Sequence, residues 1–146
     1  MSSRAVLGAL SLSKMTAITG WILTSIAVLG YRYFMLSKEL VAASTVPLVL
    51  SVLADGENYG YALIQRVRDL SEGRIEWTEG MLYPVLHWME DQDLIVSEWR
   101  AAESGRRRKY YRLRQQGHKV LNAERQQWMA VHETLSKLWK MKPHLT

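Results

Sequence analysis

The spacing of apolar residues changes along this chain, and that change restricts the fold more than any other feature of the sequence. Between residues 44 and 93, three successive segments repeat their apolar residues at the spacing of helices. Residues 94–99 and 109–113 then read as short strands, and residues 115–139 return to helical spacing. We therefore predict a mainly α-helical protein with a small β-hairpin and a long last helix.

Capping and turn residues mark the ends of the first two predicted helices. Ser44 and Thr45 precede Pro47, an arrangement typical of a helix start, and Gly56 is expected to end that helix. Asn58 is expected to cap the second helix, which ends near Gly73. One face of the second helix carries its large apolar residues, which are Tyr59, Leu63, Val67 and Leu70.

The third helix has the clearest start signal. Thr78 is a good N-cap, and Glu79 is favoured by the helix dipole in the first turn. Residues 75–77, just before it, alternate in polarity and are predicted to form a short strand. The face expected to be buried consists of Leu82, Val85, Leu86 and Met89.

Charge is distributed unevenly around the predicted hairpin. Residues 55–98 contain ten acidic and three basic residues, whereas residues 100–119 contain eight basic residues and one acidic residue. Four of these cations are consecutive near the hairpin tip: Arg106, Arg107, Arg108 and Lys109. A solvated basic loop is the commoner interpretation of a charge run in general. Because nothing in a core needs four consecutive cations, we favour a contact with nucleic acid.

The last helix carries a short apolar seam. Its members recur at heptad spacing and are Leu121, Trp128, Val131, Leu135 and Leu138. Such a seam is too apolar to leave in water on an isolated helix, so we predict a homodimer through this helix.

The first 36 residues do not match the rest. They contain no acidic residue, and seventeen uncharged residues separate Lys14 from Arg32. A membrane anchor would need about 20 apolar residues, and no small-residue cleavage site marks a secretory signal. We favour a third interpretation, in which the native protein starts at or near Met35. The expected division is an extension at 1–36, a domain at 37–114 and a dimerisation helix at 115–142.

Several functional classes find no support in the residues. The chain has no cysteine, which excludes disulfides and thiolate chemistry and fits a reducing cytoplasm. His87, Glu90 and Asp91 share a helical face, but no fourth metal ligand accompanies them. No phosphate-binding loop or nucleophile–base arrangement stands out. We therefore expect neither an enzyme nor a cofactor or metal site.

Three helices followed by a basic hairpin is the order of a winged helix-turn-helix. In that fold the third helix enters the major groove, and the hairpin, or wing, follows the DNA backbone. The acidic stretch would then lie mostly away from the DNA, on the second helix and the end of the third.

From about Leu40 to Trp139 the chain also resembles the PadR family of transcription regulators. The resemblance rests on four segments in order, which are residues 59–61, 79–86, 94–99 and 107–113.

The resemblance implies a homodimeric repressor with one helix after the wing, released from DNA by a small, often aromatic, molecule. The DNA-binding residues it implies are Thr78, Gly80, Tyr83, Pro84, Arg106, Arg107, Arg108 and Lys109. For three of these residues a purely structural role is the alternative to DNA contact. Gly80 would only start its helix, Pro84 would only bend it, and Tyr83 would only pack against the wing. We expect three further aromatic residues to be core rather than contact, namely Tyr59, Trp99 and Tyr111.

The expected partners are duplex DNA with a palindromic operator, a second copy of the chain and a small aromatic effector. Trp128 is the expected effector site, because two indoles meeting across a dimer axis could admit a flat ring between them. The alternative is that Trp128 only fills a core. A second functional hypothesis is a winged-helix module for protein association, held at a membrane through residues 15–34, and a third is a small-molecule module without DNA activity. A docking module would expose an apolar wing, whereas this one is basic.

Overall fold

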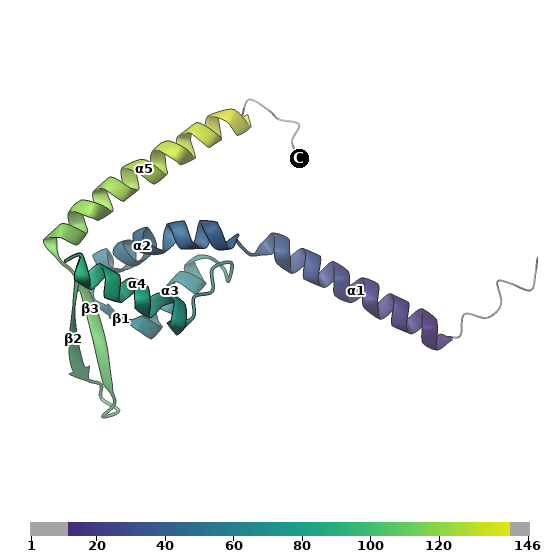
Figure 1. Cartoon of the computed structure of the whole chain (residues 1–146), viewed down its shortest axis with the longest axis horizontal. Helices are drawn as coiled ribbons and strands as arrows, with labels where there is room; N and C mark the ends of the chain where they lie inside the picture. Colours follow the sequence, from purple (N-terminus) through teal and green to yellow (C-terminus); the bar gives the residue numbers. More distant parts are fainter. Residues whose placement is uncertain (1–11, 141–146) are drawn as a thin grey trace, which may run out of the picture. The chain divides into compact units, whose positions relative to one another are not determined.

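A computed structural model of the protein describes residues 12–140 (Figure 1). Its elements follow the order α1 (Leu12–Phe34), α2 (Lys38–Asp55), β1 (Asn58–Tyr59), α3 (Gly60–Leu70), α4 (Glu79–Asp91), β2 (Ile95–Ala101), β3 (Arg107–Leu113) and α5 (Gln115–Lys140). The chain divides into two compact units, residues 1–36 and 37–146. The expected class, mainly helical with a small β wing, is confirmed.

The first unit contributes α1. Its described apolar side chains are largely exposed, with Trp21 at 78% and Leu23 at 63%. Among the described residues, no helix combines the length and the apolar character that crossing a membrane requires.

Helix α2 begins earlier than the sequence suggested, so the predicted start at Ser44 is wrong. The cap is Ser37, whose Oγ accepts a hydrogen bond from the Leu40 amide at 3.2 Å. Thr45 lies inside the helix and donates its hydroxyl proton to the Val41 carbonyl at 2.7 Å. A hydroxyl residue before a proline therefore resembles a cap, although here it bonds back to its own helix. The predicted end at Gly56 is confirmed.

The turn between α2 and α3 contains a strand that the sequence did not reveal. Asn58 does not cap α3: its Oδ1 accepts from the Tyr59 amide, and Tyr59 is the N-cap without a side-chain bond. Together these two residues form β1, which pairs antiparallel with β3 to give a three-stranded sheet in the order β1-β3-β2. Residues 75–77 form no strand. Ile75 and Trp77 are buried and Glu76 is exposed, so the alternation predicted burial but not pairing.

The core of the second unit lies between the helices and the sheet. Its most deeply buried side chains include Leu50, Leu63, Leu82, Leu86 and Met89. The predicted face of α4 is confirmed for Leu82, Leu86 and Met89, whereas Val85 is half-buried. On α3 the prediction held for Leu63 and Val67 but was wrong for Leu70, which is 61% exposed.

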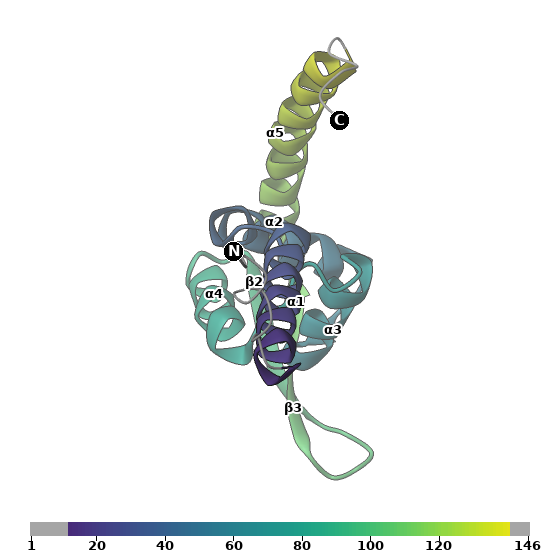
Figure 2. The ribbon, with the colours of Figure 1, turned by 90° about the vertical axis from the view of Figure 1, so that its right-hand side faces the viewer.

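The first turns of α5 dock onto this core. A Cβ on Gly117 would lie only 2.2 Å from the Leu94 carbonyl oxygen, so only glycine allows the helix to approach so closely. The same carbonyl accepts a hydrogen bond from the Arg114 amide at 2.9 Å. Further along, α5 extends beyond the other elements of its unit, and the wing projects at the opposite end (Figure 2).

Candidate nucleic-acid interface

Helix α4 presents an open, exposed first turn. Thr78 caps it, with its Oγ1 accepting from the Met81 amide at 3.3 Å. Thr78, Glu79 and Gly80 are all exposed, and a Cβ on Gly80 would meet only the Thr78 hydroxyl, at 3.9 Å. Packing within the chain therefore does not require glycine at position 80. Pro84 is also exposed, one turn further along the helix.

Tyr83 joins α4 to the start of α3. Its hydroxyl oxygen lies 2.8 Å from the position that a Cβ on Gly60 would occupy, and the side chain is half-buried. Tyr83 thus packs across the first residue of α3, and the missing side chain of Gly60 makes room for it. The packing alternative for Tyr83 is the one its surroundings favour.

The wing is longer and tighter than the sequence indicated. Strands β2 and β3 each have seven residues and pair from Ile95↔Leu113 to Ala101↔Arg107. The turn is closed by two hydrogen bonds of 2.8 Å, from the Ala102 amide to the Arg106 carbonyl and from the Gly105 amide to the Ala102 carbonyl. Gly105 adopts a φ of +78°, which favours glycine. The tip of the wing is therefore a closed turn.

The four consecutive cations do not share one environment. Arg106 and Arg107 are exposed, and neither has an acidic partner within residues 12–140. Arg108 is half-buried, with its guanidinium carbon 4.5 Å from the centroid of the Tyr59 ring. Lys109 differs from all three, because its Nζ lies 3.4 Å from Glu90 Oε1 and its side chain is only 23% exposed. Lys109 is therefore a structural ion-pair partner rather than a free cation.

A polar cluster under the wing ties it to α4. Glu90, on α4, pairs with Lys109 on β3 and accepts a hydrogen bond from the Ser97 hydroxyl on β2 at 2.9 Å. Tyr111 is buried nearby. Burial raises the pKa of its phenol to about 12, and the charge of Glu90 and the neighbouring Tyr83 act in the same direction. The phenol therefore stays neutral in ordinary buffers.

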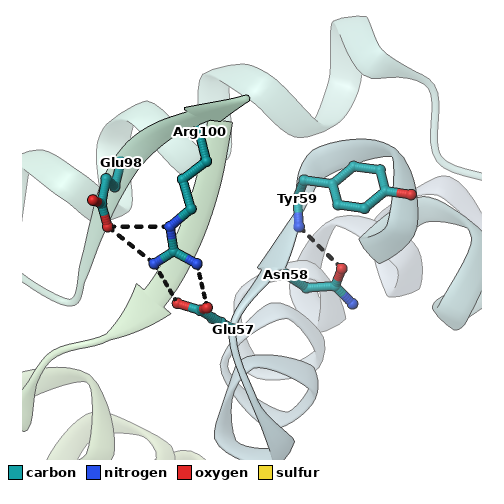
Figure 3. A network of polar contacts seen from close by, with 5 residues as sticks. All are labelled: Glu57, Asn58, Tyr59, Glu98 and Arg100. Carbon is teal, nitrogen blue, oxygen red and sulfur yellow. Dashed lines mark hydrogen bonds and ion pairs between the residues drawn. The ribbon is translucent and has the colours of Figure 1, made fainter. Parts of the chain in front are cut away.

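A second network clamps the other face of the wing (Figure 3). The Arg100 guanidinium donates to both carboxylate oxygens of Glu57, in the turn before β1, and to Glu98 Oε2 at 2.9 and 3.3 Å. The hydrogen bond from Arg100 lowers the pKa of Glu57, and the two carboxylates raise the pKa of Arg100. Sequence reasoning missed this network because Glu57 and Arg100 are 43 residues apart.

An open groove of about 710 Å³ lies between the start of α3, α4 and the wing. Its cations are Arg106, Arg107, Arg108 and the ion-paired Lys109, with Glu79 at its α4 side. Trp99 also lines it and is 56% exposed, so the expectation that Trp99 is core is wrong, whereas Tyr111 is buried as expected. The groove offers cations, aromatic rings and a helix N-terminus, which is the chemistry that phosphodiesters need.

Comparison with known families agrees with this geometry. The model of the transcriptional regulator PadR-like family matches residues 49–123, just over half of the chain, from α2 through the wing to the start of α5. This chain belongs to the PadR family. It is accordingly a DNA-binding transcriptional regulator, and the resemblance noted in its sequence is confirmed.

Relatives of this PadR protein include named regulators and solved structures. The transcriptional regulator Rv3488 of Mycobacterium tuberculosis is 37% identical over 88 residues, covering 60% of this chain and 78% of the relative. YqjI of Escherichia coli is 30% identical over 88 residues, and the match covers only 41% of that longer protein. PadR-family structures from Eggerthella lenta (32% identity, TM-score 0.59) and Clostridium difficile (31%, 0.58) cover 84% and 65% of this chain and 96% and 97% of their own.

The predicted seam of α5 is divided between two environments. Leu121 is buried against its own unit with 5% exposure, so it is not on the free surface of this chain. Trp128 is half-buried, and Leu135 is 37% exposed. Val131 and Leu138 are more than half exposed, as are two residues the seam omitted, Met129 and Trp139.

Proposed function

We propose that this PadR regulator represses transcription by binding a palindromic operator as a homodimer. Helix α4 would enter the major groove through its exposed first turn, with Thr78 and Gly80 nearest the bases. The wing would follow the backbone. The observation that carries this proposal is the row of three arginines, Arg106 to Arg108, without acidic partners in the described residues and lining the groove beside α4.

The dimer is proposed to form through the exposed face of α5. Val131 and Leu138 are 55% and 53% exposed on one chain, and burying a large apolar side chain contributes about 1.5–3 kcal/mol. Trp128 and Leu135 would complete the contact, whereas Leu121 would support it from within its own unit. A two-fold dimer of winged helices expects half-sites about 34–36 Å apart.

Trp128 is the proposed effector site. It is half-buried on a single chain, so part of its indole is available to a partner or to a ligand. A flat aromatic compound between two such indoles would gain about 0.5–1.5 kcal/mol per ring pair beyond area burial. If it changed the spacing of the two α5 helices, it would also lower DNA affinity by linkage.

Footprinting and transcription in vitro test this function. The full chain should protect two half-sites, one helical turn apart, in the DNA upstream of its own gene and should reduce transcription from that DNA. A planar aromatic compound should quench tryptophan fluorescence and restore transcription, and Trp128→Ala should remove both effects while sedimentation still shows a dimer. Absence of protection, or a monomer at micromolar concentration, contradicts the proposal.

A further inference from the structure

Two arginines face each other across the wing. In the β2–β3 register, Arg100 is directly opposite Arg108. Like charges at such cross-strand positions destabilise a hairpin, because their side chains are close neighbours on one face. The wing therefore needs some means to hold Arg108, which lines the DNA groove, opposite a second guanidinium.

The contacts of Arg100 supply that means. Its charge is compensated by Glu57 and Glu98, and its guanidinium carbon lies 5.1 Å from the centroid of the Tyr110 ring. Tyr110 meets Tyr59 edge to face at 5.5 Å between ring centroids, and Tyr59 carries Arg108 on its own ring. A continuous ladder thus runs from Arg100 through two tyrosines to Arg108. It crosses all three strands, since Tyr59 belongs to β1, Tyr110 to β3 and Arg100 to β2.

We propose that Arg100 is a positioning residue for DNA binding. Through Glu57 it fixes the wing to the turn that leads into α3, and through the tyrosine ladder it holds Arg108 in the groove. Although Arg100 belongs to the basic segment, it does not contact phosphate, because two carboxylates already satisfy it. This inference rests on the proposed DNA-binding mode of the wing.

Removing a carboxylate gives the sharpest test, because a positioning role for Arg100 and a purely electrostatic role predict opposite changes in DNA affinity. Glu57→Gln makes the protein more positive, so a purely electrostatic account predicts tighter binding to DNA. If Arg100 positions the wing, Glu57→Gln instead weakens binding by about threefold to tenfold. Glu103→Gln is the matched control: Glu103 is exposed in the wing turn and has no ion pair in the described residues, so its removal should tighten binding. Tighter or unchanged binding by Glu57→Gln overturns the proposal.

A second measurement separates positioning from contact. We would titrate a fluorescein-labelled duplex from the upstream region with full-length protein at several salt concentrations. Arg100→Gln should lower affinity without changing the salt slope, whereas loss of a phosphate contact would reduce the slope by about 0.9. In a double-mutant cycle, Arg100→Gln should be non-additive with Arg108→Gln and additive with Arg106→Gln.

The outcomes distinguish a failure of the positioning role of Arg100 from a failure of the proposed DNA-binding function on which it rests. A wild-type protein that fails to bind the duplex contradicts the proposed function itself. Binding by the wild type with a reduced slope for Arg100→Gln makes Arg100 a phosphate contact and overturns only the positioning role. Unchanged affinity in Arg100→Gln also overturns it. Circular dichroism of each variant confirms that the fold is intact, which is expected because every substituted position is exposed or half-buried.

Discussion

The tip and the body of the wing both carry basic side chains, but those at the tip lack acidic partners whereas most of those in the body form ion pairs. At the tip, residues 101–108, the three arginines have no acidic partner among the described residues. In the body, residues 95–100 and 109–114, Arg100, Lys109 and Arg114 each pair with a carboxylate from another part of the chain. The fourth body cation, Arg112, forms no ion pair in the described residues, although its charge helps to lower the pKa of Glu57. We therefore infer that the tip cations contact DNA, whereas the paired cations of the body hold the wing in place. On this account the position of a cation in the fold, not the local charge count, decides whether it can bind phosphate.

The largest expected effect on DNA binding comes from removing the positive charges of the tip. Replacing Arg106, Arg107 and Arg108 by Gln should weaken binding to all DNA sequences and lower the salt slope by up to about 2.7, because each lost phosphate contact accounts for about 0.9. Fluorescence anisotropy across a salt series measures this. An unchanged slope in the triple variant would show that the tip does not lie on the backbone.

The body should respond in stability before it responds in affinity. Lys109→Gln leaves the largely buried Glu90 carboxylate without its cation, which should lower the free energy of unfolding by about 1–3 kcal/mol. Arg107→Gln, two residues away and exposed, should change it by less than about 0.5 kcal/mol. Urea denaturation followed by tryptophan fluorescence compares the two. Equal effects would remove the distinction between tip and body.

A smaller effect, on stability at high pH, tests whether water is excluded from the body of the wing. The pKa of Tyr111 is raised to about 12 by burial, above the value of about 10 expected for the unfolded chain. The unfolded state therefore loses this proton first, so the stability contributed by Tyr111 is complete below pH 10 and falls as the pH rises towards 12. Alkaline difference spectroscopy should show one late-titrating tyrosine that Tyr111→Phe removes. Loss of an early-titrating tyrosine instead would mean that the phenol is open to water.

Most of the fold could be predicted because its signals are local. The order of helices, the wing and α5 follow from apolar spacing, and Thr78 and Gly56 act through neighbours within a few residues. The start of α2 was misplaced by a local signal, because Thr45 bonds back to its own helix instead of capping it. The errors in the strands involve partners distant in the chain. Asn58 became part of a strand because β3 pairs with it, and residues 75–77 did not because they pair with none of the described strands.

As with the fold, the parts of the candidate interface that depend on neighbouring residues could be predicted, and those that depend on distant partners could not. A run of arginines indicated the wing tip, but nothing near Lys109 in the sequence shows that Glu90 would neutralise it. The acidic stretch was expected to lie mostly away from the DNA, but the sequence did not show what its carboxylates would contact. Four of them form ion pairs with the wing body: Glu57, Glu90, Asp93 and Glu98. Tertiary structure thus divides one basic segment into cations that form ion pairs and cations that do not.

The most direct test compares one cation from each region by the same measurement. Arg107→Gln and Lys109→Gln remove one positive charge each, two residues apart on the same strand. Salt-dependent binding to the upstream duplex should show a slope reduced by about 0.9 for Arg107→Gln and an unchanged slope for Lys109→Gln. Equal reductions in the two variants would mean that both cations lie on phosphate, which would contradict the division of the wing into a DNA-contacting tip and a supporting body.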